Sequence, residues 1–144
     1  MFCSEELMSM FKLITGVVLT FLSLTALAAG DEWVWQAKTQ SGHFQLELYP
    51  NEKPVPLSKF HIWEIKVLNS QGEPVENAQL AITGGMPGHG HGMPSQPQVS
   101  GYLGEGRYKI EGMKFNMFGK WLLLVGVQAG AVSDKASFDI LLDY

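Results

Sequence analysis

The sequence predicts an all-β fold, an antiparallel Greek-key sandwich of about seven strands, preceded by an N-terminal signal helix. Two observations carry this prediction. From residue 43 onward, apolar residues recur at nearly every second position, which is the period of half-buried strands. No segment after residue 28 has a convincing helical period. About seven short strands in a domain of this size are typical of an immunoglobulin-like sandwich.

The alternation can be followed along the first half of the chain. Apolar and polar residues alternate over residues 44–48, and this strand ends at Pro50. Residues 60–68 form a second strand, with apolar side chains on both faces. The segment 69–72, Asn-Ser-Gln-Gly, supplies turn residues that tolerate positive φ. Alternation resumes at residues 78–82, which predicts the next strand.

The last third of the chain follows the same pattern. A short strand over residues 99–103 leads into the turn 104–106, and residues 107–111 alternate again. The near-continuous apolar run at 121–127 predicts a central strand covered on both faces. Residues 132–142 then alternate to the end of the domain, which completes the strands that the sequence predicts.

The N-terminal segment predicts export. Residues 13–24 form an apolar run, followed by Ala26-Leu27-Ala28, which fits the small-residue rule for signal peptidase. We expect a signal peptide at 1–28 that is cleaved after Ala28, a single β-sandwich domain at 29–144, and a periplasmic or otherwise extracytoplasmic location. The alternative is that residues 11–29 remain as a membrane anchor, the one way in which a membrane would become a partner.

Cysteine content and charge exclude several classes of site. The single cysteine, Cys3, precedes the apolar run and leaves with the signal peptide. The mature chain therefore has no disulfide, no cysteine nucleophile and no thiolate zinc site, so a metal must be held by His, Met, carboxylate or backbone. Nine basic and twelve acidic residues remain, a net charge of −3, which argues against a nucleic-acid partner.

The most specific segment is Met-Pro-Gly-His-Gly-His-Gly-Met-Pro at residues 86–94, in a glycine-rich loop between two strands. Its candidate metal ligands are Met86, His89, His91 and Met93. Histidines two positions apart on an extended segment point to the same side and could chelate one ion. Thioethers favour Cu(I) over Cu(II), and imidazoles accept both, so copper is the predicted ligand. The alternative is a flexible loop with solvated histidines and methionines that fold over the sandwich end.

Four further residues need an interpretation. Met117 lies beside the glycine turn at Gly119 and is the fifth candidate ligand, with core packing as its alternative. Met113 is interpreted as a packing residue. His61 begins a strand on the face of apolar residues, so we expect it to be packed and hydrogen-bonded. His43 has no evident partner in the sequence.

These motifs resemble a known family. The turn Gly72-Glu73-Pro74-Val75, the segment 86–94, Gly106-x-Tyr108 and Phe115-x-Met117-x-Gly119-x-Trp121 look like the YtkA-like family and the related FixH-like exported domains. The resemblance covers roughly residues 43–142. It implies an immunoglobulin-like sandwich outside the cytoplasm, associated with copper handling or with assembly of copper-dependent respiratory complexes. By position, the motif residues that it implies are Met86, His89, His91, Met93 and Met117.

Two functions are compatible with these observations. The first is a copper-binding module for metal handling or delivery, which exchanges copper with an envelope protein partner. The second is an interaction or assembly-factor domain for an envelope respiratory complex, without metal binding, whose methionine-rich loop is an adaptable apolar surface. No Gly-x-Ser-x-Gly or His-Glu-x-x-His pattern occurs, so we expect no catalytic activity. FixH-like proteins commonly keep a membrane anchor, whereas this chain has the pattern of a cleavable signal.

Overall fold

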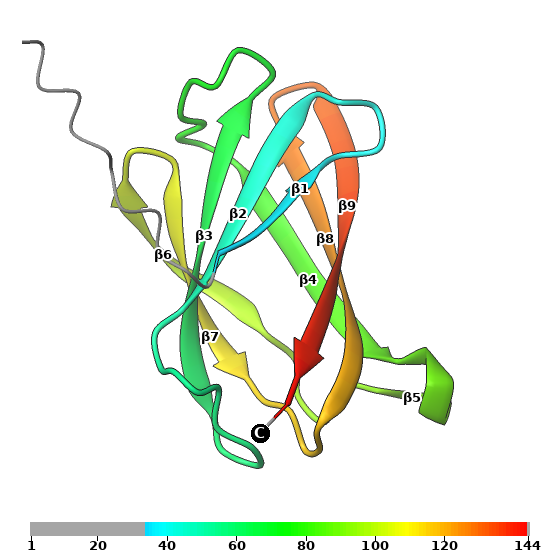
Figure 1. Cartoon of the computed structure of the whole chain (residues 1–144). Coiled ribbons are helices and arrows are strands. Elements are labelled where there is room, and N and C mark those ends of the chain that lie inside the picture. The colour runs from blue at the N-terminus through cyan, green and yellow to red at the C-terminus, as the bar shows by residue number, and fades with distance from the viewer. Residues whose placement is uncertain (1–33, 144) are drawn as a thin grey trace, which may run out of the picture.

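A computed structural model describes residues 34–143, which fold into nine strands and one short 3-10 helix (Figure 1). The predicted signal peptide lies outside the described residues. The elements are β1 (Trp35–Lys38), β2 (Phe44–Pro50), β3 (His61–Asn69), β4 (Gln79–Met86), η1 (Pro87–His89), β5 (His91–Gly92), β6 (Gln98–Gly104), β7 (Arg107–Met113), β8 (Gly119–Ala129) and β9 (Val132–Leu142).

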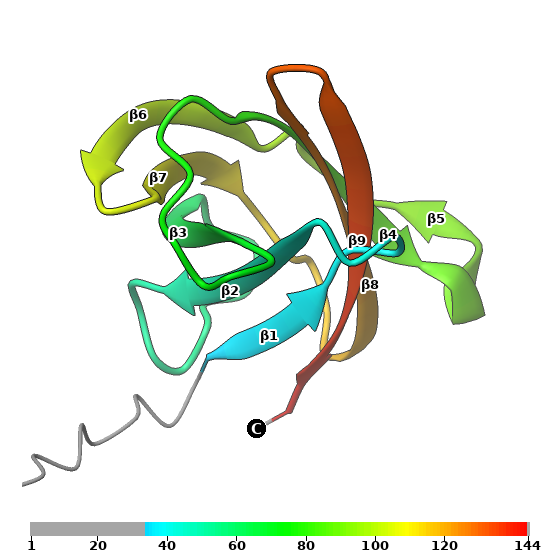
Figure 2. The same ribbon diagram turned by 90° about the horizontal axis from the view of Figure 1, so that it is seen from above.

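The strands form two antiparallel sheets that face each other (Figures 1 and 2). The larger sheet has the order β1-β2-β3-β7-β6, and the smaller has the order β5-β4-β8-β9. Every pairing within the sheets is antiparallel. The predicted all-β sandwich is therefore confirmed. The two strands beyond the expected seven are the short β1 and β5, which carry too few residues to show a period.

Alternating burial builds the core between the sheets. In β2 and β3, each buried side chain is followed by a partly exposed one, as the period of two predicts. Two tryptophans lie at the centre, with Trp63 fully buried and Trp121 1% exposed. Trp63 stacks on Trp35 with ring centroids 5.1 Å apart, and Phe115 contacts both Trp63 and Trp121. Large aromatic rings from both sheets therefore pack together in the core.

One strand differs from its prediction. Residues 121–127 lie within β8, which pairs with β4 on one side and β9 on the other, so the strand is central in its sheet. The expectation that both of its faces are covered was wrong, because Leu124 is 44% exposed. Each sheet of a two-layer sandwich buries one face, and nothing among residues 34–143 covers the other face at Leu124. No helix in this part of the chain has the length and apolarity to cross a bilayer.

Candidate metal site

The predicted metal-binding segment folds as a hairpin. The strand predicted at residues 78–82 continues as β4 through Gly84 and Gly85 to Met86, because backbone pairing with β8 requires no side chains. The chain then turns through η1 and returns as β5. Gly90 has φ +70°, and its N–H donates to the carbonyl oxygen of Met86 at 3.0 Å. The expected flexible loop is thus a hydrogen-bonded hairpin, which projects from the smaller sheet (Figures 1 and 2).

Glycines let the backbones of the hairpin approach each other. A Cβ atom at Gly85 would lie 2.5 Å from the carbonyl oxygen of His91, and one at Gly84 would lie 2.6 Å from the carbonyl oxygen of Leu122. Real Cβ atoms do not approach backbone atoms that closely, so these two positions require glycine. The N–H of Met93 donates to the carbonyl oxygen of Gly84 at 2.9 Å, which extends the pairing beyond β5.

Met86 lies where the hairpin joins the core. It is 1% exposed, and its methyl group packs against Gly119, where an added Cβ would lie only 2.9 Å from it. Met86 also lines a hollow of about 350 Å³ together with His89 and Gly119. In the ladder, Met86 pairs directly with His91, which brings their Cβ atoms to about 5 Å and onto the same face. Met86 is therefore the ladder partner of His91 and shares the lining of one hollow with His89.

His89 and His91 are exposed, and their ring centroids lie 6.0 Å apart. An ion bound at the usual metal–nitrogen distance of about 2 Å lies about 3 Å from a ring centroid, so one ion can join rings about 6 Å apart. The Nδ1 atom of His91 lies 3.0 Å from the carbonyl oxygen of Gly92. A carbonyl only accepts hydrogen bonds, so Nδ1 carries the hydrogen and Nε2 presents its lone pair. Metal-binding histidines are oriented in this way.

Trp121 supports the ring of His91 from the core side. The two rings meet edge to face with centroids 5.7 Å apart. The indole Nε1 donates to the carbonyl oxygen of Met117 at 3.1 Å, which connects the segment before β8 to the same tryptophan. The sequence prediction treated Trp121 as a core residue alone. The spacing Met117-x-Gly119-x-Trp121 was the signal available, but the contact with His91 joins positions 30 residues apart.

The five predicted ligands are only partly brought together. The hairpin carries three of them, with Met86 paired to His91 across the ladder and the ring of His91 near that of His89. Met93 and Met117 are half-buried and pack against the edge of the core. The backbone carbonyl of Met117 accepts a hydrogen bond from Trp121, whose ring contacts His91 of the hairpin. Met93 comes directly after β5 in the chain. The structure therefore separates a compact group of three from two methionines at its margin.

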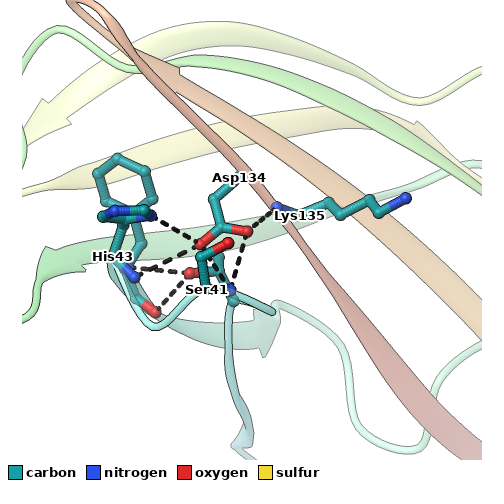
Figure 3. A network of polar contacts seen from close by, with 6 residues as sticks. Ser41, His43, Asp134 and Lys135 are labelled. Atoms are coloured by element: carbon teal, nitrogen blue, oxygen red, sulfur yellow. Dashed lines mark hydrogen bonds and ion pairs between the residues drawn. The ribbon is translucent and has the colours of Figure 1, made fainter.

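The two other histidines lie in different surroundings. His61 is 4% exposed, and its Nδ1 accepts a hydrogen bond from the indole of Trp63 at 2.8 Å, as its packed interpretation predicted. Nδ1 is therefore unprotonated and engaged by the indole, and Nε2, which carries the proton of the neutral ring, offers no lone pair to a metal. Burial lowers the pKa of His61, while the charge of Glu52 opposes this. His43, for which the sequence indicated no evident partner, places Nδ1 3.2 Å from the carboxylate of Asp134 (Figure 3).

The donor chemistry points to a soft ion. Within residues 34–143, no three side chains of His, Cys, Asp or Glu come together as a metal site. A third ligand beside His89 and His91 must therefore come from Met86 or another thioether, from backbone, or from solvent. Two imidazoles with a thioether suit copper, whereas zinc sites use thiolates, imidazoles and carboxylates.

The comparisons with known proteins give one match. The family model described as YtkA-like matches residues 36–125, a range that contains the whole hairpin, Met117 and Trp121. Neither the curated proteins nor the solved structures include a match to this chain.

Proposed function

Because the chain belongs to the YtkA-like family, we propose that it is an exported, non-catalytic copper-binding module that acts in the periplasm or another extracytoplasmic compartment. Copper is its cargo, which it exchanges with a protein partner of the cell envelope. The observation that carries the proposal is the grouping of His89, His91 and Met86 on one hairpin, with the Nε2 lone pair of His91 set free by the bond from Nδ1 to Gly92.

The three proposed ligands differ in the copper oxidation state that they favour. The imidazoles of His89 and His91 bind either Cu(I) or Cu(II), and the thioether of Met86 adds affinity for Cu(I). Met93 and Met117 are the further thioether donors of the proposal. Both lie half-buried at the margin of the hairpin, from which they can replace another ligand one at a time. Such stepwise exchange lets copper pass to a partner without being released to water.

We also propose that the sandwich is an immunoglobulin-like Greek key. The chain crosses from one sheet to the other between β3 and β4, between β5 and β6, and between β7 and β8. Repeated crossing between two antiparallel sheets is characteristic of that class. The crossings also explain why both sheets contribute to the end of the sandwich that carries the hairpin.

Anaerobic copper titration with metal analysis tests the proposal. We expect one copper ion per chain, accompanied by a change in tryptophan emission because Trp121 contacts His91. Replacing His89 and His91 together with alanine should lower copper affinity by more than the roughly 10- to 100-fold that follows loss of a supporting hydrogen bond. The matched control is His43→Ala, which removes an exposed histidine from the turn between β1 and β2. This turn lies at the opposite end of the sandwich from the hairpin (Figure 1).

Unchanged copper affinity in the double variant would remove the copper proposal. If the protein with its native hairpin binds no copper, the non-metal interaction or assembly-factor function takes its place. Limited proteolysis separates the two outcomes further. Bound copper should protect residues 86–94 from cleavage. A scaffold that binds no metal should be cleaved at the same rate with and without added copper.

A further inference from the structure

We propose that the outer face of the four-stranded sheet binds a second copy of this chain, related by a two-fold axis that runs across the strands at Leu124. The outer face consists of the side chains of β4, β8 and β9 that point away from the core. This inference stands apart from copper binding. Cross-strand pairing arranges the centre of the face in three rows, which are Gly85, Leu122 and Asp139, then Thr83, Leu124 and Ser137, then Ala81, Gly126 and Lys135.

The middle row is suited to self-contact. Leu124 is 44% exposed at the midpoint of β8, and its neighbours Thr83 and Ser137 are small and uncharged. A large apolar side chain on a flat surface gains free energy when it is removed from water. A two-fold axis through this row places each Leu124 against the partner's Leu124.

The outer rows are complementary under the same rotation. Rotation about this axis reverses the direction of the strands, but each β9 still lies over the partner's β9 and each β8 over the partner's β8. Leu122 then faces the partner's Gly126, so that a large side chain meets an empty position. Asp139 faces the partner's Lys135, and the reciprocal pair forms on the other side of the axis, as an isologous interface requires. Shape and charge therefore match at one register.

The charges of the outer face agree with this register. Lys135 has no ion-pair partner in the part of the chain that the structure describes, and its side chain extends away from the neighbouring carboxylate of Asp134 (Figure 3). Asp139 pairs with Lys120 at 3.3 Å, but both side chains are about two-thirds exposed, so this pair is weak and can be exchanged.

The position of the hairpin favours an axis across the strands over an axis along the strands. Pro87 and His91 line a hollow of about 210 Å³ together with Leu122 and Leu124, so the hairpin borders one end of the outer face. An axis along the strands would bring both hairpins to the same end and place Asp139 over the partner's Gly85. An axis across the strands puts the hairpins at opposite ends. A tilt of about 15° from the perpendicular gives the crossing of about 30° at which aligned sheets pack.

The size of the face predicts a weak dimer. Three strands about 4.8 Å apart and about 35 Å long present about 500 Å² of flat surface per copy. Stable interfaces bury about 800 Å² per partner, so this face belongs to the lower class. We therefore expect dissociation in the micromolar range or weaker.

Sedimentation equilibrium of the purified protein, from about 10 µM to about 1 mM, tests the inference. Leu124→Glu should raise the dissociation constant at least tenfold, because each carboxylate would lie against the partner's. Leu103→Glu is the matched control, since Leu103 is a 51% exposed leucine on β6 of the other sheet. Circular dichroism melting should show that both variants remain folded.

Charge exchange tests the register itself. Asp139→Lys and Lys135→Asp should each weaken the dimer, because like charges would face each other across the axis. The double variant should recover the dimer, because the opposite charges meet again. A monomer over the whole concentration range, a dimer that survives Leu124→Glu, or a double variant weaker than both single variants would each overturn the proposal.

Discussion

The chemistry of each histidine depends on what its second ring nitrogen contacts. In His61, the indole of Trp63 donates to Nδ1, so Nε2 keeps its proton and the ring packs as a neutral core residue. In His91, the carbonyl of Gly92 accepts from Nδ1, so Nε2 is left with a lone pair. One hydrogen bond each therefore distinguishes a packed histidine from one that presents a lone pair, a difference that sequence spacing does not report.

Met86 can be tested without disturbing the core. Replacing Met86 with leucine conserves volume and should change the free energy of unfolding by less than about 1.5 kcal/mol. We expect the affinity for Cu(I) to fall about tenfold or more, which corresponds to about 1.4 kcal/mol, because the thioether is lost. Affinity for Cu(II), bound through the two imidazoles, should change much less. Competition titrations with each oxidation state measure the difference.

A matched substitution controls for packing. Met113 ends β7 and is fully buried, as is appropriate for the packing role that the sequence predicted. Met113→Leu should leave the affinity for both copper ions unchanged. Equal losses of Cu(I) and Cu(II) affinity in Met86→Leu would show that Met86 supports the hairpin rather than binding copper.

At the scale of elements, the glycines of the hairpin can be separated by their surroundings. Gly85→Ala puts a Cβ 2.5 Å from a backbone oxygen. This should destabilise the paired hairpin by roughly 1–3 kcal/mol, so that the hairpin opens locally. We expect faster amide exchange at Met93, whose N–H bonds to Gly84, and weaker copper binding. Hydrogen exchange with mass spectrometry reads the first effect, and titration reads the second.

Gly88→Ala is the corresponding control. Apart from Gly88 itself and its two chain neighbours, no heavy atom lies within 4 Å of the position of its Cβ, and its φ is not in the left-handed region. Alanine there should leave the hairpin intact, with a small gain in stability because the unfolded chain loses freedom. Equal exchange rates in the two alanine variants would contradict the close approach at Gly85.

The sequence predicted most elements because their side chains report their surroundings. Strands β2, β3, β7 and β9 alternate between core and solvent, and the alternation is visible in the residue types. The hairpin was predicted as a loop because glycine has no side chain to alternate. Its order comes from backbone pairing, which leaves no hydrophobic period. Exposure of Leu124 was missed for the opposite reason, since an apolar run does not reveal which side of a sheet lacks a cover.

At the scale of the whole molecule, only part of the candidate site could be predicted. The spacing of His89 and His91 indicated a chelating pair, and the structure places them 6.0 Å apart. The roles of Trp121 and Gly119 depend on β8 lying beside β4, a contact between segments more than 30 residues apart in the chain. Local patterns therefore indicated candidate ligands, whereas the topology determines which of them meet.

Local sequence patterns also do not predict a contact that joins the two sheets at the end of the sandwich opposite the hairpin. Asp134 lies near the start of β9 in the smaller sheet, yet its carboxylate accepts hydrogen bonds from the backbone N–H groups of Ser41 and His43 in the β1–β2 turn of the larger sheet (Figure 3). The pair Ser41 and Asp134 is 93 positions apart. The side chain of Asp134 is only 3% exposed, so this carboxylate holds the two sheets together.

Acid should therefore loosen the sandwich at this contact. Burial alone would raise the pKa of Asp134, but hydrogen bonds from the Thr39 hydroxyl and from the N–H groups of Lys135, Ser41 and His43 outweigh it and hold the pKa well below its usual value of 3.8. A lowered native pKa stabilises the fold fully above the unfolded value, and this stabilisation is lost as the pH falls below about 3.8 and through the native pKa.

Asp134→Asn should consequently lower the melting temperature at pH 7, because the neutral amide keeps a single acceptor oxygen and loses the charge. The variant should also lose less stability than the native protein between about pH 5 and pH 2, since it has no carboxylate to protonate there. Thermal melting across that range measures both effects. Asp143→Asn, which changes an exposed aspartate near the end of the chain, is the control. Parallel melting curves for the native protein and Asp134→Asn over the acid range would contradict the role of Asp134 as the link between the sheets.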